Sequence, residues 1–108
     1  MKKSIKIANG QGFWGDSIDA PYNLVKYGKI DYLTLDYLAE VTLSIMQRQK
    51  LKNAKKGYAT DFVDLMKRII IDVVKKNIKI ITNAGGVNPE ICREQLLKIA
   101  NELNLNIK

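Results

Sequence analysis

The sequence predicts an α/β protein with a three-layer, Rossmann-like parallel sheet flanked by helices. Short segments rich in β-branched residues alternate with longer segments of helical periodicity along the whole chain. The short segments are more apolar than strictly alternating, which is typical of parallel strands covered on both faces. Right-handed crossovers through the helices then place such strands side by side.

Three segments are predicted as strands, at residues 4–8, 31–36 and 78–82. A fourth is predicted to begin at 105–108, so we expect an incomplete sheet of three or four strands. An edge strand of four residues leaves the sheet small and one edge open. The chain is then expected to be either a portion of a longer protein or a subunit that another chain completes.

Four helical segments connect and follow these strands. A short helix is expected to stop at Gly28, and a second is predicted over 37–52. A third begins with Thr60 as its N-cap and carries a wide apolar face, so it should be largely buried. The last begins with Asn88 as N-cap and Pro89 in its first turn.

Length and composition restrict both the organisation and the chemistry. At 108 residues, 1–108 is expected to form a single domain. One cysteine and no histidine exclude an intrachain disulfide, the usual zinc sites and the Ser/His/Asp and Cys/His catalytic groups. Catalysis by this chain would have to use carboxylates, lysines, tyrosines or backbone amides.

The formal net charge of +7 has two interpretations. It favours anionic partners, but 15 of the 18 basic residues are lysine in a chain rich in Ile and Asn, which indicates compositional bias. No motif interleaves basic and aromatic residues, so nucleic acid is not an expected partner. Five basic residues end the second helix and either stay solvated or form an anion-binding patch: Arg48, Lys50, Lys52, Lys55 and Lys56.

Neither a secretory leader nor a membrane span is expected. Two lysines follow Met1, but no apolar run of signal-peptide length comes after them. No stretch approaches the 18 apolar residues of a membrane-spanning helix. We therefore expect a cytoplasmic protein without a membrane partner.

Three polar or glycine-bearing segments follow the three predicted strands, at residues 9–16, 36–40 and 83–88. Because ligands of parallel sheets bind beyond the carboxyl ends of the strands, we expect these segments to form one site. Its candidate substrate-binding residues are glycines, aromatic residues and amides: Gly12, Phe13, Trp14, Gly15, Asn83, Gly85, Gly86 and Asn88.

The first of these segments contains a literal dinucleotide-binding fingerprint. Gly10, Gly12 and Gly15 have the spacing GxGxxG, and Asp36 lies 21 residues beyond the last glycine. However, two bulky aromatic residues lie inside the turn, and Asp16 would repel a pyrophosphate at the helix N-terminus. We therefore do not expect NAD, and interpret the segment as another kind of substrate loop or a structural turn.

Three acids near this edge are candidate catalytic residues: Asp16, Asp36 and Glu40. If the second helix begins early, Asp36 and Glu40 share one of its faces and form a carboxylate pair for acid/base catalysis or for Mg²⁺. Each acid could equally cap a helix or pair with a lysine. No metal ligands are assigned, and the cofactor remains open.

Several other residues have a structural and a functional interpretation. Trp14 either covers the core or forms an apolar wall for a ligand. The glycine pair at 85–86 either binds an anion or makes a tight turn. Tyr58 and Asp61 lie at the opposite edge in a simple crossover, unless an intervening helix returns them to the site. Cys92 is expected to be a small buried residue.

Four motifs together resemble the acyclic terpene utilisation AtuA-like family: Gly12-Phe-Trp-Gly-Asp16, Asp36-Tyr-Leu-Ala-Glu40-Val-Thr42, Gly57-Tyr-Ala-Thr-Asp-Phe62 and Thr82-Asn-Ala-Gly-Gly-Val-Asn-Pro89. They occur in the family's order and spacing, and the resemblance runs from residue 7 to about residue 89. Such proteins are several times longer, so the chain is similar to their N-terminal portion.

The resemblance implies a cytoplasmic protein of acyclic terpene or branched acid catabolism, often encoded beside enzymes of acyl-CoA metabolism. It suggests part of an enzyme that acts on an acyl-CoA or related carboxylic ester. The alternative is a non-catalytic assembly or ligand-binding subunit that a partner chain, or another copy in a homo-oligomer, completes.

Overall fold

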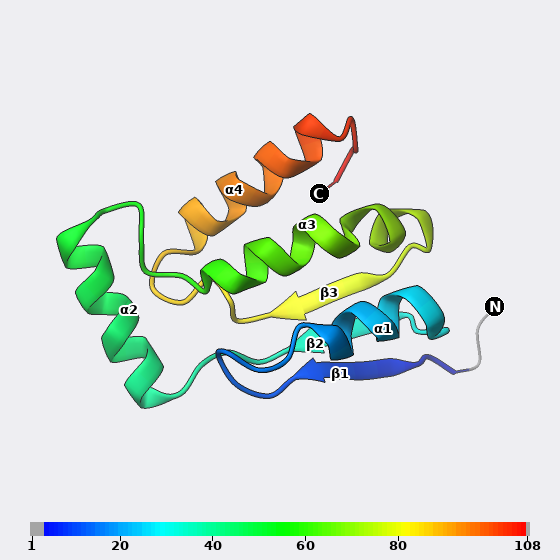
Figure 1. Ribbon diagram of the computed structural model, residues 1–108, viewed down its shortest axis with the longest axis horizontal. Coiled ribbons are helices and arrows are strands. Elements are labelled where there is room, and N and C mark those ends of the chain that lie inside the picture. The colour runs from blue at the N-terminus through cyan, green and yellow to red at the C-terminus, as the bar shows by residue number, and fades with distance from the viewer. Residues whose placement is uncertain (1–3, 108) are drawn as a thin grey trace.

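A computed structural model describes residues 4–107 and contains a parallel sheet with the strand order β1-β2-β3 (Figure 1). The strands are β1 (Ile7–Gln11), β2 (Tyr32–Leu35) and β3 (Lys79–Thr82). In the parallel register, Ala8 lies beside Leu33, which lies beside Ile80. The predicted α/β fold with an incomplete parallel sheet is confirmed.

Residues 4–107 also form four helices. They are α1 (Asp19–Tyr27), α2 (Glu40–Lys52), α3 (Thr60–Lys75) and α4 (Pro89–Glu102). The first packs on β1 and on α3, and α3 packs on α4. The second stands apart from them, at the end of the molecule toward which the strand arrows point (Figure 1).

The two faces of the sheet differ in exposure. Leu33 and Leu35 point to one face and are buried with the apolar residues of α3, which form most of the core. Ile7 and Ile81 point to the other face and are 61% and 58% exposed. Residues 4–107 thus supply two of the three layers that the sequence predicts, the sheet and the helices on one face. The buried side chains of α3 are Phe62, Val63, Leu65, Met66, Ile69, Ile70 and Val73.

The first strand begins and ends three residues later than the sequence predicts. Gly10 and Gln11, which we expected in a loop, belong to β1, and the register shifts between Asn9 and Gln11. A Cβ atom on Gly10 would lie 2.9 Å from both Leu35 and Pro21. The glycine is therefore needed for close packing of α1 on the sheet.

The fourth predicted strand is wrong for residues 105–107, and Lys108 lies outside the described residues. Asn104 has φ 55°, and the Leu105 N–H donates to the Ala100 carbonyl at 2.8 Å. This Schellman motif ends α4, and Leu105 and Ile107 pack against the core without pairing with β3. Asn77 ends α3 in the same way, also with φ 55°.

The helix ends confirm part of the capping prediction. Gly28 ends α1, and Pro89 occupies the first turn of α4 after Asn88, as predicted. The N-cap of α3 is Ala59, however, and Thr60 is already helical, so the predicted Thr60 cap is wrong. Asn88 stands at its N-cap position but makes no side-chain cap, because its amide bonds to a neighbouring loop.

Helix α2 begins three residues later than the sequence predicts. The Thr42 hydroxyl accepts a hydrogen bond from the Ala39 N–H at 2.6 Å and so sets the start at Glu40. Among residues 4–107, no helix has the length and apolar character needed to cross a membrane.

Candidate functional site

The three segments that follow the strands meet at the carboxyl edge of the sheet. The Asp36 N–H donates to the Gln11 carbonyl at 3.0 Å, which joins the ends of β1 and β2. The Thr82 hydroxyl donates to the Leu35 carbonyl at 2.8 Å, which joins the ends of β2 and β3. This edge, with its three connected segments, is the candidate site.

A buried hydrogen bond between Gln11 and Tyr37 lies beneath the edge. The Tyr37 hydroxyl donates to Gln11 Oε1, and both side chains are almost completely buried. Gln11 Nε2 donates to the Asp16 carbonyl at 2.9 Å. The Tyr37 ring also meets Phe62 edge-on, with 5.9 Å between the ring centroids. Burial, reinforced by the nearby Asp61 carboxylate, raises the pKa of Tyr37 well above its usual value, so the hydroxyl acts as a donor. Neither Gln11 nor Tyr37 was among the candidate site residues.

The loop after β1 is folded by its own carboxylate. Asp16 Oδ2 accepts from the Gly12 N–H at 3.0 Å, and Oδ1 accepts from the Ser17 N–H at 2.8 Å. A dinucleotide pyrophosphate would need amides of this kind, but Asp16 already occupies them. Gly12, Gly15 and Phe13 remain exposed, and Phe13 shows 61% of its surface. The backbone of the loop is therefore held by hydrogen bonds to Asp16, while the Phe13 side chain is exposed to solvent.

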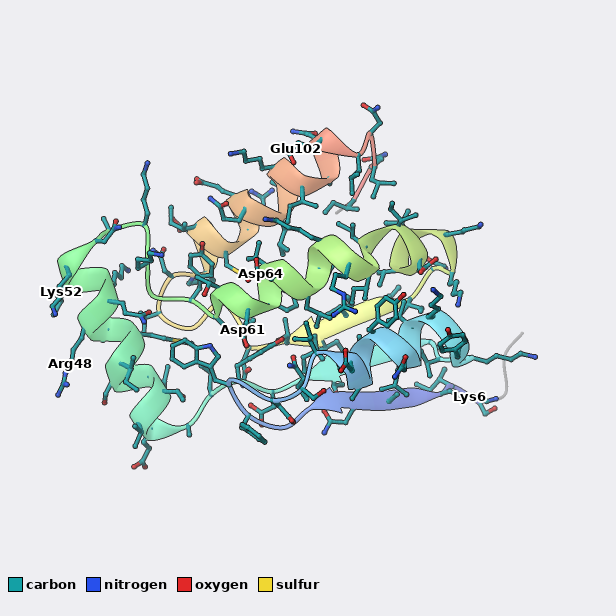
Figure 2. The ribbon with its side chains drawn as sticks, in the orientation of Figure 1. Lys6, Arg48, Lys52, Asp61, Asp64 and Glu102 are labelled. Carbon is teal, nitrogen blue, oxygen red and sulfur yellow. The ribbon has the colours of Figure 1, made fainter. Side chains whose placement is uncertain are left out.

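Trp14 connects this loop to the start of α3. Its Nε1 donates to Asp61 Oδ1 at 2.8 Å, and its ring packs against the core. Figure 2 shows Asp61 near the first turn of α3, at the end of that helix that faces α2. Because α2 stands at the edge and does not cross the sheet, α3 makes the crossover and starts at the carboxyl edge. The sequence left this open; the structure places Asp61 beside the site.

Asp36 and Asn83 are the exposed polar pair of the edge. Asn83 Nδ2 donates to Asp36 Oδ1 at 2.9 Å, and Asn83 Oδ1 accepts from the Tyr37 N–H at 2.9 Å. The bond from Asn83, together with one from the Leu38 N–H, lowers the pKa of Asp36. Asp36 is therefore a carboxylate at neutral pH, and both of its hydrogen bonds go to Oδ1.

Glu40 does not pair with Asp36 on a helical face. The two residues would share a face only if α2 began at or before Asp36. The helix begins at Glu40, so Asp36 lies outside it. Glu40 is exposed in the first turn. Within residues 4–107, no three carboxylate or thiol side chains come together in a way that could hold a metal ion.

The turn between β3 and α4 contacts the loop that joins α2 to α3. The Val87 N–H donates to the Gly57 carbonyl at 3.0 Å, and the Gly86 N–H donates to the Asn83 carbonyl at 3.1 Å. Asn88 Nδ2 donates to two carbonyls of the same loop, those of residues 54 and 56, at 2.9 Å each. These contacts favour the tight-turn interpretation of Gly85 and Gly86, because the amide groups of Gly86, Val87 and Asn88 are already bonded within the protein.

The basic residues at the end of α2 point in different directions. Figure 2 shows Arg48 and Lys52 extending from the outer side of α2, and Lys50 Nζ donates to the Val87 carbonyl at 3.1 Å. Cys92 is buried, as predicted, and burial raises the pKa of its thiol to about 11. It lies on the core side of α4, where it contributes to the raised pKa of Tyr37.

The fold and the edge together define a parallel α/β protein with a candidate ligand site beyond the strand ends. Comparison with models of known families matches residues 5–108 to the acyclic terpene utilisation family protein AtuA. The chain belongs to this family, and the match covers nearly its whole length. No curated protein and no solved structure matches it.

Proposed function

We propose that this chain takes part in acyclic terpene or branched acid catabolism as part of an enzyme that acts on an acyl-CoA or related carboxylic ester. The observation that carries the proposal is the juxtaposition at the sheet edge of an ionised, exposed carboxylate, Asp36, and the aromatic loop that begins at Gly12. Family membership supports the substrate class. The Rossmann-like third layer and a cytoplasmic location remain part of this proposal.

In this proposal the exposed apolar surface of Phe13 contacts the acyl chain, and Asp36 accepts a proton from the reacting group. Asp36 is ionised before substrate arrives, so it can accept a proton but has none to donate, and its lowered pKa makes it a weak base. Glu40 is an exposed acid in the first turn of α2, and Asp16 holds the loop.

Octanoyl-CoA, with free CoA and octanoate as comparisons, is the probe for this function. Trp14 is the chain's single tryptophan and lies in the loop, so its fluorescence reports binding there. We expect octanoyl-CoA to change this fluorescence, and Phe13→Ala to weaken its binding about 30-fold, since burying an aromatic side chain contributes about 2 kcal/mol. Tyr27→Ala removes another largely exposed aromatic residue, from the opposite, amino-terminal side of the sheet, and serves as control.

The base is tested by hydrolysis of the bound probe, in which Asp36 takes a proton from the attacking water, the water oxygen bonds to the acyl carbon, and the C–S bond breaks to release CoA. Asp36→Asn should keep binding but abolish turnover, whereas Asp64→Asn, an exposed acid on α3, should leave both unchanged. No fluorescence response to octanoyl-CoA, or equal effects of Phe13→Ala and Tyr27→Ala, would overturn the proposed site.

A second candidate function is that of an assembly subunit completed by a partner chain. It is favoured by the sheet face on which Ile7 and Ile81 are more than half exposed, because monomers rarely leave such strands uncovered. Light scattering and co-purification test it. A stable monomer that neither self-associates nor retains a partner contradicts this function.

A further inference from the structure

A groove of about 780 Å³ runs along the outer edge of β3, between this strand, α3 and α4. It lies on the core side of the sheet, and the end lined by Thr82 and Gly85 reaches the carboxyl edge. Its lining is mostly apolar and comes from all three elements. The apolar residues that matter here are Met66, Ile70, Val73, Ile80, Leu96 and Ile107.

The backbone of β3 faces into this groove with hydrogen-bonding groups. The Lys79 N–H donates to the Asp31 carbonyl at 3.0 Å, toward β2. Successive residues of a parallel strand direct their N–H and C=O groups to opposite sides. Ile80 and Thr82 therefore direct theirs away from β2, and both residues line the groove.

No strand among residues 4–107 pairs with this side of β3, because β3 is the last strand of the sheet order. The outward groups recur every second residue, about 6.6 Å apart. A hydrocarbon ligand would fill the apolar lining but leave these groups unbonded. Another extended peptide satisfies both the apolar lining and the backbone.

The charges of the groove indicate the chemistry of that peptide. Among residues 4–107, the charged side chains that line it belong to Lys79 and Arg93, and no side-chain carboxylate does. A second copy of this chain is a poor occupant, because its own sheet edges bring Lys6 beside β1 and Lys79 on β3. An occupant with acidic residues at its ends complements both cations.

We propose that the groove binds a β-strand of another polypeptide, which adds to the edge of β3. The strand carries apolar residues at alternate positions and acidic residues at its ends. The groove runs from Asn77 to Thr82 along the strand, about 20 Å, which accommodates about six residues. This inference deepens the second proposed function, since it names where and by what chemistry a partner chain joins the sheet.

The probe is a fluorescein-labelled heptapeptide with the sequence Glu-Val-Thr-Val-Thr-Val-Glu, and the comparison peptide has lysine at both ends. The protein should bind the glutamate peptide at least about tenfold more tightly. The double variant Lys79→Glu/Arg93→Glu should reverse this preference. Its control, Lys67→Glu/Lys98→Glu, makes the same change of net charge at exposed positions outside the groove and should preserve the preference.

Two further measurements separate strand addition from apolar adsorption. Bound peptide should slow hydrogen exchange at the Ile80 and Thr82 amides, with little change at Lys79, which is already bonded. N-methylation of the three valines, which keeps their side chains and removes their N–H groups, should weaken binding about tenfold or more.

Equal binding of the two peptides, or unchanged exchange at Ile80 and Thr82, overturns the inference. If the peptides fail but the chain still assembles stably with a partner, this groove is not the contact and the second proposed function stands. If the glutamate peptide binds as expected while no assembly is found in solution, the groove is supported and that function is contradicted.

Discussion

Replacing Tyr37 with phenylalanine tests whether the Gln11–Tyr37 bond supports the candidate site. The substitution keeps the ring and its edge contact with Phe62 but leaves Gln11 Oε1 without its donor, in a side chain that is 1% exposed. A buried acceptor without a partner costs about 1–3 kcal/mol. For a domain of this size, that lowers Tm by about 4 °C or more.

Urea unfolding followed by Trp14 fluorescence and by circular dichroism measures this change in the free energy of unfolding. Tyr27→Phe is the matched control, because the same hydroxyl is removed from a tyrosine that is 74% exposed; its effect should stay within about 0.5 kcal/mol. Adding Gln11→Met to Tyr37→Phe should cost less than the sum of the single changes, since the unpaired acceptor is then gone. A Tyr37→Phe effect as small as that of the control would refute the reasoning.

The same residue gives a pH dependence with a defined sign. Burial raises the pKa of Tyr37 in the folded protein, so the folded state holds this proton more tightly than the unfolded state does. The resulting stability is complete below about pH 10, the usual tyrosine pKa, and declines as the pH rises beyond it. Tyr37→Phe should therefore unfold with a flatter alkaline dependence than the wild type.

Three further changes test neighbouring contacts. Gly86→Ala should cost about 2 kcal/mol or more in urea unfolding, because φ is 57° there and a Cβ would lie 2.7 Å from the Gly57 carbonyl oxygen; an unchanged midpoint contradicts this. Lys76→Met should cost about 1 kcal/mol, since Lys76 Nζ donates to two carbonyls at the end of α1 at 2.7 Å each, whereas Lys75→Met should be nearly neutral. The Cys92 thiol, with its pKa raised to about 11, should label slowly at pH 8 in the folded protein, and its contribution to stability should decline from about pH 9 to 11; rapid labelling without urea would show that it is accessible.

The parallel sheet was predictable because its signals are local. Apolar strands alternate with helices, and Gly28 and Pro89 mark helix ends through their own backbone preferences. The misplaced first strand shows the limit of such reasoning. Gly10 resembles a loop residue, yet it lies in β1 because Pro21 and Leu35 approach it closely, and nothing local to the glycine indicates that approach.

The contacts of the candidate site were less predictable because they join distant residues. Trp14 and Asp61 are separated by 47 positions, and Gln11 and Tyr37 by 26. The Trp14–Asp61 pair depends on α2 standing at the sheet edge, which periodicity does not reveal. The end of α4 did carry a local signal: Asn104, like Asn77, is a residue type that readily adopts positive φ after a helix, and it argued against a fourth strand.

The placement of α2 explains how the glycine-containing loop after β1, residues 12–16, is held in place. A crossover needs one helix, and α3 supplies it, so α2 serves to bring Asp61 and the loop around Gly57 to the carboxyl edge. Asp61 then fixes Trp14 from one side, while Gln11 holds the Asp16 carbonyl from below. Bonds from both ends restrain the loop and leave its Phe13 tip exposed, which is the arrangement expected of a preorganised ligand contact.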